Sequence, residues 1–394
     1  MRVKVGVFFG GRSVEHEVSV VSALQAIEAM NKEKYEVVPI YIAKSGLWYT
    51  GDALLDVDRY KDSPTLLSAC RQITVVNNLS EVVVIRYPLG RFSNNVINTL
   101  DVALPVLHGT YGEDGAMQGF FESVGLPYAG CDVLSSAIGM DKIVTKSVLL
   151  QAGIPIVKYS WFYALDWLKN PEATIAAVER DVPYPVIVKP ANVGSSVGIK
   201  KAANRAELEE AIELARNFSA KILIEELVVS LKEINCSVLG DWDEARTSVC
   251  EEPVSSSEIL SYQDKYLNKG TKGMGGAKRK VPADLSEQLA DEIKSLAKKT
   301  FLAVGCAGVV RIDFMIDAAA GNKVYVNELN TIPGSLSFYL WEATGVKFPE
   351  LIDELIRLAL KRKRDRSSIM YSYDANIFNM KGTGGLKMGS KSKA

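Results

Sequence analysis

The first 130 residues alternate between strand-like and helix-like patterns of apolar side chains. Apolar runs typical of buried strands occupy residues 3–9, 35–42 and 102–107. Between the first two runs, Val20, Leu24 and Ile27 fall on one face of a helical pattern, and a second helical pattern covers residues 116–125. This alternation favours an α/β unit built on a doubly wound parallel sheet.

Two further units of mixed strand and helix pattern follow. A helix is predicted from about Met140 to Gly153, and the Ile-Pro after this glycine is typical of a domain border. The second unit then reads as an α+β unit, with strands at 185–190, 197–202 and 221–227 and a helix at 205–217. The third has a helix at 284–304, two strands flanking Gly321 and an amphipathic last helix at 348–363.

These patterns predict three structured units and a tail. We expect an N-terminal α/β domain at 1–139, a central unit at 140–233, a C-terminal unit at 234–362 and a basic, disordered tail at 363–394. The tail is rich in Gly, Ser and Lys and has little apolar content.

Composition and charge exclude several classes of function. The 46 Lys and Arg nearly balance the 47 Asp and Glu, so no overall field favours nucleic acid or an anionic membrane. No apolar run approaches the roughly 18 to 20 residues of a membrane span, and we expect a cytoplasmic protein. The five cysteines are scattered without a CxxC pair, which indicates buried reduced thiols and neither a zinc site nor a disulfide framework.

Polar residues interrupt an apolar strand at 323–330, and the turn Pro333-Gly334 follows. Strand alternation predicts that Glu328 and Asn330 share a face with Val324 and Val326. If Ala320-Gly321 is a tight hairpin loop, Asp313 lies opposite Glu328 and Arg311 opposite Asn330. Facing carboxylates repel unless a cation lies between them, and two carboxylates with an amide suit Mg²⁺. The alternative is a solvated edge hairpin without function, and a longer loop would shift the register.

A second polar stretch, VIVKPANVGSSVGIKK, places Lys189 at the end of an apolar strand and Gly194, Ser195, Ser196 and Gly198 after it. Backbone amides of such a loop can surround phosphate oxygens, while hydroxyls and a lysine add donors. The pattern therefore indicates a nucleotide site, although a plain Gly-Ser turn is the alternative. It is not a Walker loop, because GxxxxGK[ST] is absent. Lys142 and the carboxylates Glu225 and Glu226 add support, since a carboxylate can accept from an adenine amino group.

Seven motifs, in this order, resemble those of the D-alanine:D-alanine ligases of the ATP-grasp superfamily. They are GGRSVEHEVS (10–19), VLHGTYGEDGAMQG (106–119), MDK (140–142), VKPANVGSSVG (188–198), YQDKY (262–266), RIDFM (311–315) and NELNTIPG (327–334). The resemblance extends to about residue 360. It implies an ATP-grasp fold in residues 140–362 after an N-terminal substrate domain. The glycines at 10 and 11 could instead suggest a dinucleotide fold, but GxGxxG is incomplete.

The resemblance implies a two-step reaction in peptidoglycan precursor synthesis. ATP phosphorylates the carboxylate of one D-alanine, and the amine of a second attacks the acyl phosphate, releasing ADP and phosphate. Mg²⁺, as two ions and replaceable by Mn²⁺, would be bound by Asp313, Glu328 and Asn330. Phosphates would be held by Lys142, Lys189, Ser196 and Lys265, and the adenosine by Glu225, Glu226 and Glu233.

The same resemblance assigns residues to the amino-acid substrates. Arg311 and the N–H of Gly334 would stabilise the oxyanion of the tetrahedral intermediate. Glu15 would pair with the first substrate's ammonium in a relay with Ser195 and Tyr266, and His108 would contact the same D-alanine. A tyrosine at 266 goes with peptide rather than ester synthesis in the family. The family also suggests a homodimer and a mobile lid around YQDKY.

The sequence departs from the family after Gly334. The family commonly has a Thr-Ser-His-Ser type of run, whose last serine binds the second substrate's carboxylate. Here Phe338 stands in place of the histidine and Tyr339 in place of the serine. Either the phenol of Tyr339 donates to that carboxylate or Ser337 takes over the contact.

Three functions therefore stay open from sequence. The first is the D-alanyl-D-alanine ligase. The second is an ATP-grasp ligase with another second substrate, such as D-serine, motivated by Tyr339. The third is a nucleotide binder without catalysis, which the presence of all three expected metal ligands and Arg311 argues against.

Overall fold

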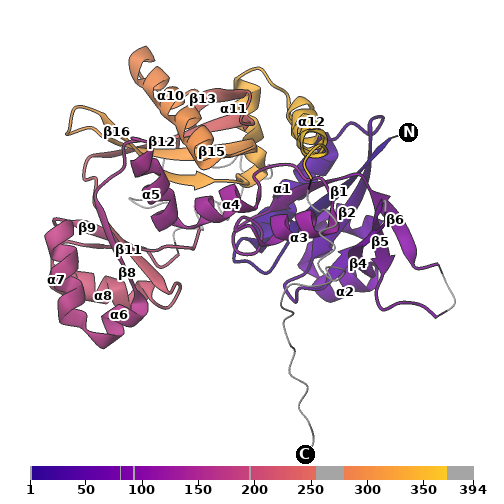
Figure 1. The fold of residues 1–394 in the computed structure, drawn as a ribbon, viewed down its shortest axis with the longest axis horizontal. Coiled ribbons are helices and arrows are strands. Elements are labelled where there is room, and N and C mark those ends of the chain that lie inside the picture. Colours follow the sequence, from indigo (N-terminus) through magenta and orange to yellow (C-terminus); the bar gives the residue numbers. More distant parts are fainter. Residues whose placement is uncertain (1, 80, 92–93, 195–196, 254–278, 371–394) are drawn as a thin grey trace, which may run out of the picture.

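A computed structural model describes residues 2–79, 81–91, 94–194, 197–253 and 279–370. Three sheets organise these residues (Figure 1). The N-terminal sheet and the four-stranded sheet lie at opposite ends of the molecule, and the five-stranded sheet lies above the space between them in this view. Within the described part of the chain, no helix is both long and apolar enough to cross a membrane.

The N-terminal sheet has seven strands in the order β6-β5-β4-β3-β2-β1-β7. Its parallel part consists of β1 (Val3–Gly10), β2 (Tyr35–Ile42) and β7 (Val102–Leu107). The other strands are antiparallel: β3 (Trp48–Thr50), β4 (Arg71–Asn78), β5 (Glu81–Arg86) and β6 (Val96–Leu100). The predicted parallel sheet is thus confirmed for three strands, and the antiparallel extension was not predicted.

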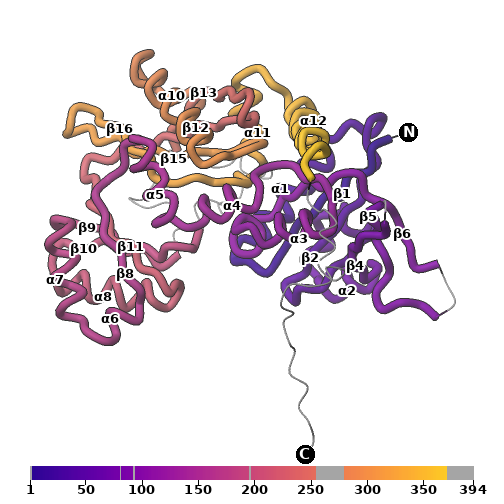
Figure 2. Tube along the Cα trace, in the orientation of Figure 1, coloured from indigo at the N-terminus to yellow at the C-terminus, as the bar shows by residue number. Residues whose placement is uncertain are grey.

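Helices cover both faces of this sheet. Helix α1 (His16–Ala29) follows β1, and α3 (Ala116–Val124) follows β7. Every residue of β7 is buried, as expected for a strand covered on both faces. The last helix, α12 (Phe348–Arg366), packs beside α1 although it is far away in sequence (Figure 2). It continues past 363, so the first residues of the predicted tail are helical, while residues from 371 onward lie outside the described part.

The four-stranded sheet is antiparallel in the order β10-β9-β11-β8. Its strands are β8 (Tyr159–Tyr163), β9 (Val186–Pro190), β10 (Lys200–Ala202) and β11 (Lys221–Glu226). Helices α6 (Ala164–Lys169), α7 (Pro171–Asp181) and α8 (Arg205–Ala215) accompany it. Val188 and Ile224 pack under α7 and α8, so their strand neighbours Lys189 and Glu225 face the opposite way. Helices α4 (Val133–Met140) and α5 (Lys142–Gln151) precede this unit.

The five-stranded sheet has the order β14-β13-β12-β15-β16. Its strands are β12 (Leu231–Gly240), β13 (Ala245–Pro253), β14 (Arg279–Lys280), β15 (Gly308–Asp317) and β16 (Lys323–Asn330). Helix α10 (Glu287–Val304) packs on one face through Ile293, Ala297 and Phe301. Short helix α11 (Phe338–Ala343) follows the turn after β16.

A bulge in β16 corrects one prediction. The hairpin loop spans 318–322, because Asp317 pairs with Lys323, and is longer than the predicted tight loop. Asn327 is then an extra residue that shifts the register, so Asp313 still pairs with Glu328, as predicted. However, the prediction that Glu328 and Asn330 share a face with Val324 and Val326 is wrong. The bulge reverses the alternation, so these valines are buried against α10 while Glu328 is not.

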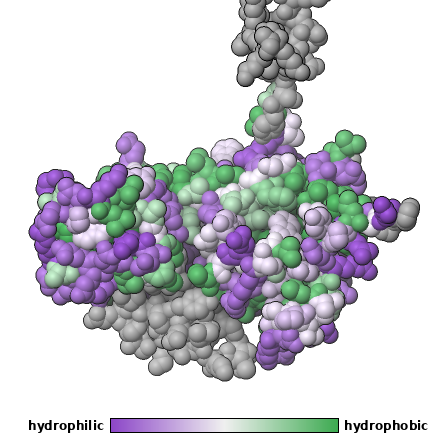
Figure 3. All heavy atoms as spheres, turned by 90° about the horizontal axis from the view of Figure 1, so that it is seen from below, coloured by the Kyte–Doolittle hydropathy of each residue, from purple (hydrophilic) through white to green (hydrophobic). Residues whose placement is uncertain are grey.

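The surface is mixed in character. In the view of Figure 3, hydrophilic residues dominate both outer ends of the molecule, and apolar residues gather towards the middle. Single exposed apolar residues are normal for a protein of this size.

Candidate active site

A row of polar side chains crosses the five-stranded sheet on the face opposite α10. Asn235 of β12 pairs with Glu251 of β13 on one side and with Asp313 of β15 on the other. Asp313 in turn pairs with Glu328 of β16. Each neighbour of these residues along its strand is apolar and packs toward α10, for example Ile312 and Phe314 beside Asp313. The sheet therefore concentrates charge on one face.

Asp313 is the best-fixed member of the row. The Arg311 guanidinium donates to its two oxygens, from Nε at 2.7 Å and from an Nη at 2.8 Å. The Asn330 amide also donates to Oδ2 at 3.1 Å. Burial would lower the pKa of Arg311, but the charge of Asp313 outweighs it and raises this pKa well above its usual range. The guanidinium therefore stays charged beside the row.

The donor set of this row fits Mg²⁺. Asp313, Glu328 and Asn330 offer carboxylate and amide oxygens, which hard cations prefer. Among the described residues there is no cluster of three or more His, Cys, Asp or Glu that could bind a metal. A cation at this place would therefore complete its shell with water and substrate oxygens, as Mg²⁺ usually does.

Two lysines from other elements approach the row. Lys142, at the start of α5, has its Nζ 3.6 Å from Glu328 Oε2 and donates to the Val193 carbonyl at 3.0 Å. Lys189, at the end of β9, donates to Asn327 Oδ1 at 3.2 Å. The bulge residue thus meets a lysine of the four-stranded sheet. Ammonium groups and carboxylates converge here, as a site for a metal-bound phosphate chain requires.

Asp141 fixes the start of α5. Its Oδ1 accepts the N–H groups of Ile143 and Val144, and its Oδ2 accepts from Lys221 at 2.6 Å and from Asn192 at 3.1 Å. Asn192 belongs to the predicted phosphate loop. The cap therefore holds α5 and this loop together.

The three glutamates predicted for the adenosine lie in different surroundings. Glu225 is 1% exposed and lies between two lysines. Burial would raise the pKa of Glu225, but these two ammonium groups hold it at about 2. Glu226 ends β11 and is half-buried, and Glu233 of β12 is close enough to contribute to the raised pKa of Lys189. Adenine binding by Glu225 and Glu226 stays a prediction.

The N-terminal domain brings Glu15 to the same place. Glu15 is the N-cap residue of α1 and is 8% exposed. A Cβ on Gly109 would lie 2.7 Å from Glu15 Oε2, and one on Gly194 would lie 3.1 Å away. Loop 108–113 and the predicted phosphate loop therefore close around this carboxylate, and both need glycine to do so. Of the predicted site residues, Ser195, Ser196, Lys265 and Tyr266 lie outside the described part.

The N-terminal domain also braces the turn after β16. His108 Nδ1 is 2.8 Å from the Ile332 carbonyl and must donate to it, so Nε2 accepts from the Ser22 hydroxyl at 3.1 Å. The Ser22 oxygen accepts the Ser335 N–H at 2.9 Å. Gly334 therefore lies between two backbone groups fixed by another domain. The contact predicted between His108 and the first substrate stays a prediction, because both ring nitrogens have protein partners here.

Glu113 is a site residue that the sequence reasoning missed. Its Oε2 accepts the Gly109 N–H at 2.8 Å and its Oε1 accepts the Ile332 N–H at 2.9 Å. Burial, and then the charge of Glu15, raise the pKa of Glu113 to about 8. An acid in a polar loop between a strand and a helix was the only signal in the sequence. Ser22 gave a similar weak signal, as a polar residue among the apolar ones of α1.

The predicted acceptor residues follow Gly334 in an unusual conformation. Ser335, Leu336 and Ser337 have φ angles of 50°, 53° and 51°, a left-handed region that side chains rarely adopt. Ser337 is fully buried, and its hydroxyl has no hydrogen-bond partner among the described residues. The turn therefore stores strain and holds a polar atom without a partner at the predicted second-substrate site.

Tyr339 is bound to protein groups in this structure. Its hydroxyl donates to Glu251 Oε1 at 2.8 Å, and the Asn235 amide donates to the same oxygen at 2.8 Å. The Arg279 guanidinium lies 4.1 Å from the centre of the tyrosine ring. A phenol has one proton to donate. The hydroxyl can therefore donate to a substrate carboxylate only if it leaves Glu251.

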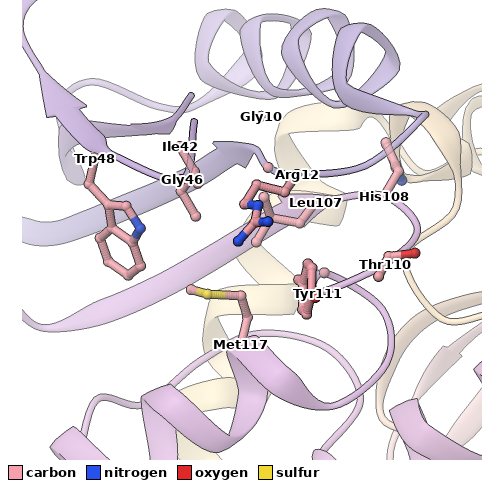
Figure 4. A pocket seen from close by; sticks show the side chains of 12 residues that line it. Gly10, Arg12, Ile42, Gly46, Trp48, Leu107, His108, Thr110, Tyr111 and Met117 are labelled. Carbon is pink, nitrogen blue, oxygen red and sulfur yellow. The ribbon is translucent and has the colours of Figure 1, made fainter. Parts of the chain in front are cut away.

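A cavity of about 210 Å³ lies at the carboxyl ends of β1, β2 and β7, beside this site. In Figure 4 the Arg12 guanidinium lies between Trp48 and Tyr111, above Met117, and His108 stands at the other end. Open α/β sheets commonly bind ligands at this edge. Its lining is mainly apolar, and His108 is the predicted site residue that it includes.

Comparisons with known proteins agree across the whole chain. The family model for the D-ala D-ala ligase N-terminus matches residues 4–131, and that for the C-terminus matches residues 148–357. The D-alanine--D-alanine ligase of Caldicellulosiruptor bescii is 42% identical over 377 residues, which cover 94% of this chain and 99% of the relative. That of Thermosipho melanesiensis is 38% identical, covering 96% and 99%.

Solved structures give the same result. The D-alanine-D-alanine ligase of Coxiella burnetii matches with a TM-score of 0.76 and 29% identity, covering 93% of this chain and 96% of its own. The VanG D-Ala:D-Ser ligase of Enterococcus faecalis also has a TM-score of 0.76, with 33% identity, covering 91% and 100%.

Proposed function

The chain belongs to the D-alanine:D-alanine ligase family, and from this premise we propose that it joins two D-alanines into D-alanyl-D-alanine with conversion of ATP to ADP and phosphate. The product would serve peptidoglycan precursor synthesis. One observation carries the proposal: the carboxylates of β15 and β16 meet lysines of another sheet, with Lys142 3.6 Å from Glu328 and Lys189 3.2 Å from Asn327.

The first step transfers the γ-phosphoryl group to the carboxylate of the first D-alanine. Lys142 and Lys189 offset the charge of the phosphate chain and hold it against β16. Asp313, Glu328 and Asn330 would hold Mg²⁺ or Mn²⁺, as two ions, and bound metal would neutralise charge on the transferred group. Glu15 pairs with the ammonium of the first D-alanine. Ser195, Ser196, Lys265 and Tyr266 keep their predicted roles as part of the proposal.

The second step is attack of the second D-alanine's amine on the acyl phosphate. The tetrahedral intermediate carries an oxyanion, which the free N–H groups of Arg311 and the N–H of Gly334 stabilise. Asp313 and the brace from Ser22 and His108 hold these donors in place before the reaction. Such preorganisation is a main source of catalysis in acyl transfer.

The second substrate is D-alanine in this proposal. The similar D-alanine--D-alanine ligases support it, although one structural relative is a D-Ala:D-Ser ligase. We infer that Ser337, with its buried hydroxyl, is the better donor to the acceptor carboxylate, and that Tyr339 shapes the subsite through Glu251.

We further propose a homodimer that acts in the cytoplasm, where ATP is available, without nucleic-acid or membrane partners. We also propose the division into 1–139, 140–233, 234–362 and a basic tail at 363–394. One sheet in each of the first three ranges supports it, with β12 crossing the boundary at 233.

A phosphate-release assay with a panel of D- and L-amino acids tests the function. We expect ATP-dependent release with D-alanine alone and a dipeptide product that mass spectrometry identifies. Glu328→Gln is the matched inactive control, because it removes one charge and almost no volume. No release with D-alanine, or release that Glu328→Gln leaves unchanged, would show that the proposal is wrong.

A further inference from the structure

Lys146 is a fully buried lysine next to the nucleotide site. It lies one helical turn after Lys142 on α5, so both side chains leave the same face of the helix. Lys142 reaches Glu328, whereas Lys146 is 1% exposed and reaches Glu225 Oε1 at 2.5 Å. Lysines are almost never buried to this extent unless they have a charged partner.

Glu225 is shared between two lysines. Its other oxygen, Oε2, lies 2.5 Å from Lys189 Nζ. The three residues form a buried triad of two ammonium groups and one carboxylate, with a net charge of one positive unit. Lys189 is the member that faces the candidate phosphate site, through Asn327.

We propose that Lys146 is a positioning residue for ATP, which acts through Glu225 to keep the ammonium of Lys189 available to the phosphates. The inference rests on the proposed function, since it takes Lys189 as a phosphate-binding group. Nothing in the sequence reasoning assigned a role to Lys146.

The physical reason is the charge count. One carboxylate cannot neutralise two ammonium groups, so while Lys146 engages Oε1, part of the Lys189 charge remains for a phosphate. Without Lys146 the whole carboxylate charge would face Lys189, and the buried pair would be neutral. Burial lowers the pKa of Lys146, whereas Glu225 raises that of Lys189 against the effect of burial, so Lys189 is the ammonium that stays charged.

Calorimetric titration of the full chain with ADP in the presence of Mg²⁺ tests the proposal. We expect Lys146→Met to weaken ADP binding about tenfold, the scale of one weakened charge-assisted hydrogen bond. The KM for D-alanine should not change. Lys146→Gln, which keeps a donor to Glu225 without its charge, should behave like Lys146→Met, and Lys146→Arg should restore binding.

The double variant Lys146→Met/Glu225→Gln gives the decisive sign. It removes one charge of each kind, so Lys189 regains its net positive charge and ADP affinity should recover part of the loss. A merely structural role for Lys146 predicts a further loss instead. Ile212→Ala is the control for a destabilised four-stranded unit, because Ile212 is buried in its core on the α8 side.

The outcomes separate the two proposals. If the wild type binds ADP and Lys146→Met binds equally well, or if the double variant is weaker than Lys146→Met, the role of Lys146 is wrong and the proposed function stands. If Lys146→Met does not fold, the comparison of Lys146→Gln with Lys146→Arg decides in the same way. A wild-type chain that does not bind ADP would overturn both proposals.

Discussion

Ser22→Ala should separate the brace on the Gly334 turn from ordinary stability. The Ser22 oxygen accepts the Ser335 N–H at 2.9 Å and its hydroxyl donates to His108 Nε2 at 3.1 Å. The side chain is 1% exposed, so water cannot replace it. Alanine would leave two buried polar groups without partners, at about 1 to 3 kcal/mol each when unpaired. We expect a loss of about 2 to 4 kcal/mol of stability, since such costs are not fully additive.

Part of this energy should appear in catalysis. The turn holds Gly334, whose N–H is proposed to stabilise the oxyanion, and a loosened turn must be ordered again in each transition state. If about half of the loss, about 1 to 2 kcal/mol, is expressed there, kcat falls about 5- to 30-fold. Phosphate release at saturating D-alanine and ATP measures kcat, and urea unfolding measures stability.

Ser19→Ala is the matched control. Ser19 lies on the same helix and is equally buried. Its oxygen accepts the Gly10 N–H at 2.7 Å and its hydroxyl donates to the Val106 carbonyl at 2.5 Å, both within the N-terminal domain. It should lose similar stability with a much smaller change in kcat. Equal losses of kcat in the two variants, or an unchanged kcat in Ser22→Ala, would refute the reasoning.

Three further predictions concern protonation, metal and the second substrate. Burial lowers the pKa of His108 to about 4. Its neutral form therefore contributes stability that is complete above pH 6.5 and is lost toward pH 4, by about 3 kcal/mol in all; urea midpoints of His108→Gln should lack this acid slope. Chelation should abolish phosphate release and Mg²⁺ restore it, and Asp313→Asn should raise the Mg²⁺ concentration for half-maximal rate at least about tenfold; an unchanged titration would contradict the metal assignment. Tyr339→Ser should alter the KM of the second D-alanine and leave that of the first almost unchanged, with Tyr339→Phe intermediate because it keeps the ring under Arg279; equal effects on both constants would show that the subsite assignment is wrong.

Local pattern was sufficient for the elements and for much of the site. The apolar runs predicted β1, β2 and β7, and the oxygen ligands were visible as polar residues inside an apolar strand. The pairing of Asp313 with Glu328 was predicted correctly from a loop of the wrong length. The Asn327 bulge compensated for that error, and nothing in a single sequence marks where a ladder gains an extra residue.

Residues that act through distant partners could not be predicted in the same way. Ser22, Glu113 and Lys146 are polar residues whose neighbours in sequence indicate no site. Their meaning comes from Ser335, Ile332 and Glu225, to which they are joined only after the sheets assemble.

The sequence by itself determined the order of elements, the kinds of ligand and the family, because periodicity and residue chemistry are local properties. Only the tertiary structure decided how charges share partners. It turned Glu328 to the face away from α10, gave the Tyr339 proton to Glu251 and set Cys236 opposite Cys250, although the cysteines are scattered in the chain. Each of these outcomes depends on the register between strands and on contacts between domains. Those are fixed by the packing of the whole core.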